Sequence, residues 1–230
     1  MKKLVLIIAV TGVAAVSSFG QGLVNFANAS LSNFSTNSQV NWLGQSLQGG
    51  TTGLTVSSAT VANQYYYALL MQTYSGSGAT VASTLASVLS GGWTYAGVTA
   101  TNALGAGRVA GGASAATTAA DPTSGNPPNQ FIVVGWSTGL GSTWATVSAE
   151  LAAAITAGNF DPSLWGNYIG ITASGSGTGQ SASSETLFGT AGTGILTPST
   201  LFSTTAVPEP ATMVLAGLGG LSLLALRRKK

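Results

Sequence analysis

Short segments in the middle of the chain alternate between apolar and polar residues or are apolar throughout, and Gly, Ser and Asn separate them. Alternation with a period of two is typical of β-strands that bury one face. Residues 130–137 (QFIVVGWS) are apolar at most positions, as expected of a central strand that is covered on both faces. Strands are predicted at residues 22–31, 64–73, 92–102, 130–137, 167–174 and 193–202. The predicted fold is therefore mainly β, a β-sandwich for which a jelly-roll-like arrangement is one form.

The same alternation assigns side chains to faces within two of these strands. In the strand at 64–73, one face carries Tyr65, Tyr67, Leu69 and Met71. In the strand at 92–102, one face carries Trp93, Tyr95, Thr99 and Thr101. The strand at 193–202 is interrupted by Pro198, which has no amide hydrogen to donate. Its packed part is expected to centre on Ile195 and Leu196.

One segment follows a helical period instead. Apolar residues recur every three or four positions in a stripe of Trp144, Val147, Leu151 and Ile155. Such a stripe predicts an amphipathic helix, which Ser142 can cap at its N-terminus and Gly158 can end. We expect this helix to lie against an edge of the sheet or across one end of the sandwich. Residues 80–89 fit both a helix and one face of a strand.

Three stretches have the composition of connections between packed elements. Residues 105–120 (GAGRVAGGASAATTAA) and 174–184 (SGSGTGQSASS) are of low complexity and predict long, flexible segments. Residues 121–129 (DPTSGNPPN) predict a loop because prolines interrupt regular structure.

Charged residues are scarce and gather at the two ends of the chain. They make up 5% of the 230 residues, against about 25% in typical soluble domains. Residues 21–206 hold a single cation, Arg108, against four carboxylates, and are weakly acidic. Because a nucleic-acid-binding surface requires clustered Lys and Arg, we exclude nucleic acid as a partner.

The N-terminal residues 1–20 have the three parts of a secretory signal peptide. Lys2 and Lys3 precede a largely apolar run at 4–16, and Ser18 and Gly20 are small residues before a cleavage site ahead of Gln21. The alternative is a membrane-anchoring helix. The apolar run would rise only about 20 Å, which is short of a hydrocarbon core of about 30 Å.

The C-terminus combines an apolar stretch with a final cluster of four cations. Residues 211–226 would rise roughly 24 Å as a helix, a marginal length for a membrane anchor. The cations at 227–230 resist translocation and are expected to stay cytoplasmic. Pro208 and Pro210 flank Glu209 and favour an extended backbone. An extended segment beside a membrane is open to a processing enzyme, as in other removable anchors.

The order VPEP, a short Leu/Gly/Ala-rich stretch and a terminal RRKK cluster resembles the PEP-CTERM sorting signal of Gram-negative bacteria. The resemblance covers Val207–Lys230 alone. It implies processing at the inner membrane by an exosortase-like enzyme, followed by transfer to the cell surface or to extracellular exopolysaccharide. By the same resemblance, the recognition motif would be Pro208, Glu209 and Pro210. The stop signal would be Arg227, Arg228, Lys229 and Lys230. A plain C-terminal anchor with coincidental prolines remains the alternative.

These features together predict five segments along the chain. They are a signal peptide at 1–20, a β-sandwich body at 21–202, a linker with the Pro-Glu-Pro motif at 203–210, a transmembrane helix at 211–226 and a basic cytoplasmic tail at 227–230.

The sequence contains neither histidine nor cysteine. A Ser-His-Asp triad and a zinc site built from His and Cys are therefore excluded. Paired carboxylates suffice for a glycosidase, and the body offers Asp121, Glu150, Asp161 and Glu185. These are spread along the chain, form no Asp-x-Asp cluster of the kind that calcium favours, and are expected to be solvated surface charges. We expect no catalytic residue, no metal and no cofactor.

Aromatic residues are the better candidates for contact with a ligand. They are Trp42, Trp93, Trp136, Trp144, Trp165 and the run Tyr65, Tyr66 and Tyr67. Such rings stack on sugars in some proteins, although they more often fill a core. The first hypothesis is a non-enzymatic, exported protein of the cell surface or extracellular matrix. The alternatives are a carbohydrate-binding module retained in exopolysaccharide and, third, a glycoside-active enzyme.

Overall fold

The computed structural model describes residues 21–27, 34–37, 52–54, 64–74, 84–103, 107–112, 115–120, 129–172, 175–177, 185–188, 196–197 and 199–205. These residues are mainly β, as predicted. The strands are β1 (Gln21–Asn25), β2 (Phe34–Asn37), β3 (Thr52–Leu54), β4 (Tyr65–Thr73), β5 (Thr94–Asn102), β6 (Val109–Ala110), β7 (Ala115–Ala120), β8 (Asn129–Ser137), β9 (Tyr168–Ile171), β10 (Gly175–Gly177), β11 (Glu185–Thr186) and β12 (Ser199–Ser203). The helices are α2 (Leu85–Ser90) and α3 (Trp144–Ala157), with short 3-10 turns η2 (Thr138–Leu140) and η3 (Pro162–Leu164).

A large sheet has the strand order β3-β2-β12-β9-β8-β4-β5-β6, and β10 adds to β8 beside this path. Strand β8 lies near its middle and pairs antiparallel with β4 from Tyr65↔Ser137 to Thr73↔Asn129. Residues Asn129 to Trp136 are all buried, which confirms the prediction of a central strand covered on both faces.

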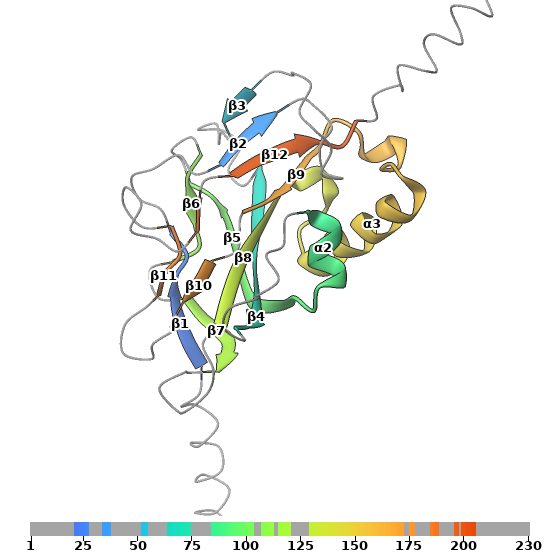
Figure 1. The fold of residues 1–230 in the computed structure, drawn as a ribbon. Coiled ribbons are helices and arrows are strands. Elements are labelled where there is room, and N and C mark those ends of the chain that lie inside the picture. Colours follow the sequence, from blue (N-terminus) through green and yellow to red (C-terminus); the bar gives the residue numbers. More distant parts are fainter. Residues whose placement is uncertain are drawn as a thin grey trace, which may run out of the picture.

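A smaller sheet of order β11-β1-β7 stands against one face of the large sheet. The chain after β1 ties the two sheets together, because Gly111 donates its amide to the carbonyl of Phe26 at 2.8 Å and Phe26 donates to Gly112 at 2.9 Å. The amide of Phe34 in β2 also bonds to the carbonyl of Gly107, just before β6, at 3.2 Å. The large sheet therefore curls, so that β2 near one end lies beside the chain just before β6 at the other end (Figure 1).

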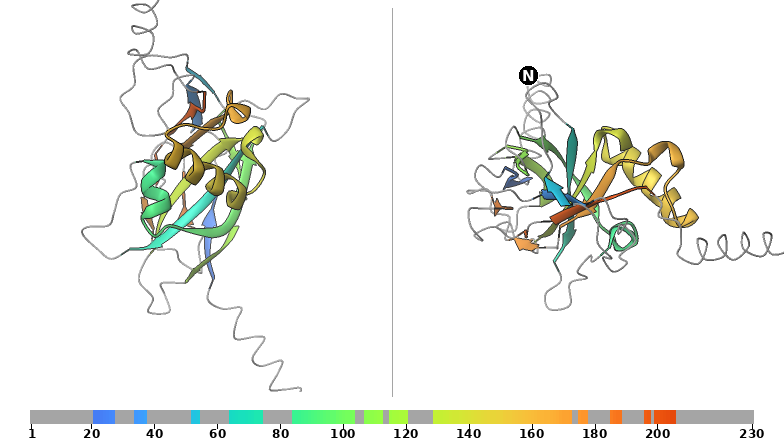
Figure 2. Two further views of the ribbon diagram at one scale, coloured as in Figure 1. Left: turned by 90° about the vertical axis from the view of Figure 1, so that its right-hand side faces the viewer. Right: turned by 90° about the horizontal axis from the view of Figure 1, so that it is seen from above.

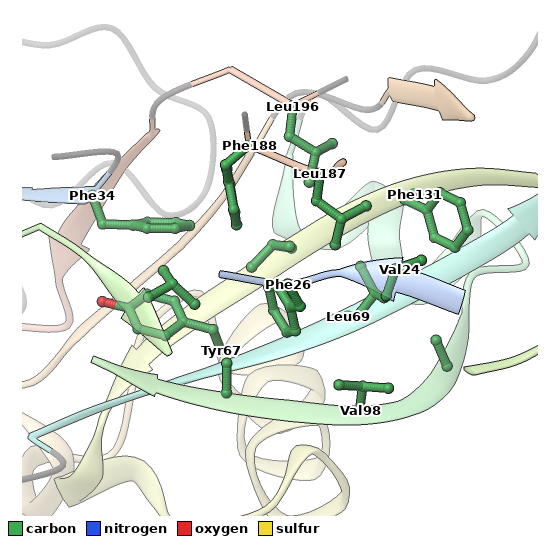
Figure 3. Close-up of a cluster of buried hydrophobic side chains, with 14 of the residues drawn as sticks. Val24, Phe26, Phe34, Tyr67, Leu69, Val98, Phe131, Leu187, Phe188 and Leu196 are labelled. Atoms are coloured by element: carbon green, nitrogen blue, oxygen red, sulfur yellow. The ribbon is translucent and has the colours of Figure 1, made fainter. Parts of the chain in front are cut away.

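Two hydrophobic cores lie on opposite faces of the large sheet. The first core lies between the large and small sheets, where the ring of Phe34 packs at a tilt against that of Tyr67 with centroids 4.5 Å apart and meets Phe188 edge-on at 5.6 Å (Figure 3). The second core lies beneath α2 and α3, which cover the other face (Figure 2). Strand β4 serves both cores, since Leu69 faces the first and Leu70 the second. Its predicted alternation is confirmed.

Helix α3 forms where the apolar stripe predicted it. Val147 and Leu151 are buried in the second core. Thr143, rather than Ser142, caps the helix by accepting the amide of Thr146 at 3.2 Å, and Gly158 ends it with a left-handed φ of 78°. The predicted position at a sheet edge or end was wrong. The helix covers a sheet face because alternate residues of β8 on that side are all apolar and are buried from water beneath it. They are Ile132, Val134 and Trp136.

The ambiguous residues 80–89 are resolved in favour of a helix over the part that is described. Thr84 and Ser87 form a reciprocal capping box at the start of α2. Leu85 and Val88 are buried, whereas Leu89 is 37% exposed. The buried residues therefore follow the helical spacing and not the alternation of a strand.

The prediction that residues 105–120 form one mobile connection was wrong, because they include β6 and β7. Small residues serve close packing here. A Cβ atom on Gly111 would lie 2.5 Å from the carbonyl oxygen of Phe26, and buried Thr117 donates its hydroxyl to the carbonyl of Gly22 at 3.0 Å. Part of the second low-complexity stretch is also regular, since β10 pairs with β8.

The last strand also lies later than predicted. It runs over Ser199–Ser203, parallel to β2 and antiparallel to β9, with Leu201 buried near its centre. Leu196 is buried in the first core but precedes the strand. The proline at position 198, which cannot donate to a ladder, separates the two.

Candidate functional site

Residues Thr204 and Thr205 are held by hydrogen bonds to the turn that follows η3. Thr204 is 1% exposed, and its hydroxyl donates to the carbonyl of Leu164 at 2.6 Å and accepts the amide of Asn167 at 3.2 Å. Its own amide donates to the carbonyl of Asn167 at 2.9 Å. One residue later, the hydroxyl of Thr205 accepts the amide of Gly166 at 2.9 Å. We call Leu164 to Asn167 together with Ser203 to Thr205 the C-terminal junction.

The turn that receives the chain is itself fixed to the sheet. The side chain of Asn167 donates to the carbonyl of Leu164 at 2.9 Å and accepts the hydroxyl of Ser137 at 2.9 Å. The same hydroxyl of Ser137 accepts the amide of Tyr168 at 2.9 Å. The two segments of the junction are thus fixed to a third, distant segment of the chain at Ser137.

Asp161 caps η3 at the outer side of this turn. Its carboxylate accepts the hydroxyl of Ser163 at 2.6 Å and the amide of Ser163 at 2.8 Å. These two bonds favour the charged form and hold the pKa of Asp161 below its usual range. The carboxylate is exposed and is engaged in the local turn.

The sorting residues begin directly after the junction. Only Ala206 and Val207 separate Thr205 from Pro208 in the sequence. The predicted motif Pro208 to Pro210, the cations Arg227 to Lys230, the apolar stretch at 211–226 and the leader at 1–20 lie outside the described residues. Among the helices that are described, none is long and apolar enough to cross a membrane. The packed body itself extends to Thr205, beyond the boundary expected at residue 202.

The candidate carboxylates occupy different elements. Glu150 is half-buried on α3, Asp161 is exposed at η3, and Glu185 belongs to β11. Asp121 lies outside the described residues. Within the part of the chain that the structure describes, no three His, Cys, Asp or Glu side chains gather in a way that could hold a metal ion.

Most of the described tryptophans contribute to the second core. Trp136 is fully buried, with its ring centroid 6.2 Å from that of Trp144 and 6.1 Å from that of Tyr66. Trp93 and Trp144 are partly buried against the same core. Trp165 is different, because 42% of its surface is exposed. Trp42 lies outside the described residues.

Strand β5 presents a second exposed aromatic residue. Tyr95 is 39% exposed, and its hydroxyl lies 2.7 Å from the hydroxyl of Thr99, which is also exposed. Tyr95 pairs with Leu70 and Thr99 with Ala68, and Leu70 and Ala68 face the second core. Tyr95 and Thr99 therefore lie on the same side of the sheet as α2 and α3, beyond the cover that the described helices give. The predicted face of Trp93, Tyr95, Thr99 and Thr101 is confirmed, except that Trp93 precedes the strand, which begins at Thr94.

The junction is the functional feature that the sequence did not reveal. Residues 203–206 were expected to be a linker, and no local pattern shows that Thr204 and Thr205 bond to a turn about forty positions earlier. The nearest signal is the hydroxyl run STT at 203–205, immediately before the sorting residues.

Comparison with known families gives one match. The model of the PEP-CTERM protein-sorting motif matches residues 206–229, which confirms the resemblance noted at the C-terminus. The match begins one residue after Thr205, the last residue of the junction. Neither the curated proteins nor the solved structures gave a match to the chain.

Proposed function

On the premise that residues 206–229 are a PEP-CTERM sorting motif, we propose that this chain is a non-enzymatic protein of the cell surface or extracellular matrix. The signal peptide carries the body across the cytoplasmic membrane, and the apolar tail with its terminal cations holds it there. An exosortase-like enzyme then separates the body from the tail at the motif Pro208 to Pro210.

The observation that carries this proposal is the division of the chain at Thr205. Up to that residue, the chain is hydrogen-bonded into the body through the C-terminal junction. From the next residue onward, it matches a sorting signal. Cleavage at the motif therefore leaves the bonds of Thr204 and Thr205 to the turn at 164–167 in place.

The non-enzymatic part of the proposal is supported by the types of side chain in the sequence and by their placement. The sequence offers no histidine or cysteine, and the described carboxylates lie on separate elements, with Asp161 bound to its own turn.

The β-sandwich class belongs to the same proposal. It is supported by the two sheets that enclose the first core, although helices cover the other face of the large sheet.

Replacement of the motif tests the sorting step. In the triple variant Pro208→Ala, Glu209→Ala and Pro210→Ala, we expect export and membrane association to persist while processing of the tail stops. Immunoblotting of membrane, surface and medium fractions measures this. The quadruple change of Arg227 to Lys230 into Ala is the comparison, because it should impair retention in the membrane instead. Unchanged processing of the triple variant would contradict the proposed role of the motif.

Carbohydrate binding is a second candidate function, favoured by the exposed ring of Tyr95. Its hydroxyl contact with Thr99 restricts the ring, and the surrounding face of β5 is polar and uncharged, as suits stacking on a sugar. Retention on exopolysaccharide beads should fall for Tyr95→Ser and persist for Leu89→Ser, which alters another exposed apolar residue. Equal retention of both variants would remove this candidate.

A further inference from the structure

Trp165 lies at the place where the chain leaves the body for its sorting tail. Its neighbour Gly166 donates its amide to the hydroxyl of Thr205, the last residue of the C-terminal junction. We propose that, while the tail anchors the chain, the turn from Pro162 to Trp165 lies against the lipid headgroups on the outer side of the same membrane. This inference rests on the proposed function, in which residues 211–226 enter the membrane.

The length of chain after the junction sets how far the body can stand from the bilayer. Six residue steps join Thr205 to Ala211, where the apolar stretch begins. A fully extended chain of that length spans at most about 20 Å. The headgroup region takes up roughly 5–7 Å of this distance on one side. Because the hydrogen bond from Gly166 to Thr205 fixes the turn at this point, Trp165 cannot lie far from the membrane surface.

The side chain of Trp165 has the properties of an interfacial anchor. The residue is 42% exposed, yet its Nε1–H already donates to the carbonyl of Phe160 at 3.0 Å. The indole is thus held in one orientation, and its polar group is satisfied within the protein. Tryptophan is enriched at the level of lipid headgroups because it combines an apolar ring with a polar edge.

The polar groups of the turn set the depth of this contact. The carboxylate of Asp161 is exposed in the same turn and bonded to Ser163. A charged carboxylate does not enter hydrocarbon. The contact is therefore with the headgroup layer, and Asp161 remains in water beside it.

The pairing register identifies the end of the body that faces the membrane. Ser203 pairs with Tyr168 and Ile169 with Trp136, so the junction lies at the Tyr65–Ser137 end of the large sheet. The start of β1 lies at the opposite end of the body (Figure 1). A processed N-terminus at Gln21 would then point away from the bilayer.

Single cysteines provide the test, because the chain has none of its own. Ser163→Cys places a unique label in the turn. Thr73→Cys places the same label at the far end of β4, eight residue steps from Tyr65 and about 26 Å away along the strand. Each full-length variant is labelled with an environment-sensitive fluorophore and reconstituted into phosphatidylethanolamine–phosphatidylglycerol vesicles. Doxyl-labelled lipids then report proximity to the bilayer, and iodide reports exposure to water.

We expect the label at position 163 to be quenched by doxyl lipids and protected from iodide, and the label at position 73 to show the reverse. Adding Trp165→Ser to the Ser163→Cys chain should lower the doxyl quenching and restore access of iodide, while the chain still floats with the vesicles. Equal quenching at the two positions, with the chain bound to vesicles, overturns the inference and leaves the proposed function intact. A chain that fails to float overturns both.

Discussion

The buried hydroxyl of Thr204 offers a direct test of whether the C-terminal junction holds the end of the chain in the body. The substitution Thr204→Val keeps the shape of the side chain and removes the hydroxyl. That hydroxyl donates to the carbonyl of Leu164 at 2.6 Å and accepts the amide of Asn167 at 3.2 Å. Valine can do neither, so both bonds are lost without creating a cavity.

The expected loss of stability depends on which hydrogen bonds the partners of Thr204 retain in the variant. The carbonyl of Leu164 still accepts the side-chain amide of Asn167 at 2.9 Å, so it does not become unsatisfied. The backbone amide of Asn167 loses its acceptor in a site where Thr204 is 1% exposed. Loss of a neutral bond costs about 1 kcal/mol, and an unsatisfied buried group costs about 1–3 kcal/mol. We expect the free energy of unfolding to fall by about 1–3 kcal/mol.

The neighbouring substitution Thr205→Val is the matched control. It makes the same chemical change and also removes an acceptor, that of the Gly166 amide at 2.9 Å. Thr205 is only half-buried, so water can replace its hydroxyl, and the loss should stay below about 1 kcal/mol. Urea unfolding followed by tryptophan fluorescence measures both variants. If Thr205→Val costs as much as Thr204→Val, burial of the junction is not what stabilises it.

Three further predictions concern the packing and the turn. Leu151→Ala should lower the free energy of unfolding by about 2–5 kcal/mol because Leu151 lies on the buried face of α3 and is fully buried, whereas Leu89→Ala, at a 37% exposed residue, should cost less than about 1 kcal/mol in urea unfolding. Gly111→Ala should destabilise by about 1–3 kcal/mol, measured as a lower thermal midpoint, because its Cβ would lie 2.5 Å from the carbonyl of Phe26. The pKa of Asp161 is lowered in the folded protein, so its stabilising effect is present above its unfolded pKa and is lost as pH falls through the folded value. Unfolding curves should therefore show a larger loss of stability in acid for the wild type than for Asp161→Asn, and parallel curves would contradict the assignment.

The elements that the sequence predicted well are those whose signal is local. The middle of strand β8 is a continuous apolar run from Phe131 to Val134, and the stripe of α3 repeats at helical spacing, so each was recognisable without knowledge of its neighbours. The strands β6 and β7 were missed because Gly, Ala and Thr carry no hydrophobic period. Strand β7 is held by pairing with β1, and β6 by pairing with β5 and by the bond of the adjacent Gly111 to Phe26, which only the folded chain brings together.

The features of the candidate site also differ in whether a local sequence pattern reveals them. The sorting motif is a linear pattern and was recognised from residues 207–230 alone. The face of Tyr95 and Thr99 followed from simple alternation. The junction could not be predicted, because the bonds of Thr204 and Thr205 reach residues 164–167 across the fold. The exposure of Trp165 was equally hidden, since it depends on how a turn docks.

The most direct test of export followed by processing at the sorting motif is mass spectrometry of the protein recovered from the cell surface and the medium. We predict an N-terminus at Gln21 and a C-terminus close to Pro208–Pro210, with all residues of the body through Thr205 retained. A surface form that still ends at Lys230 would contradict processing of the tail, and a chain that keeps Met1 and stays in the cytosol would contradict export.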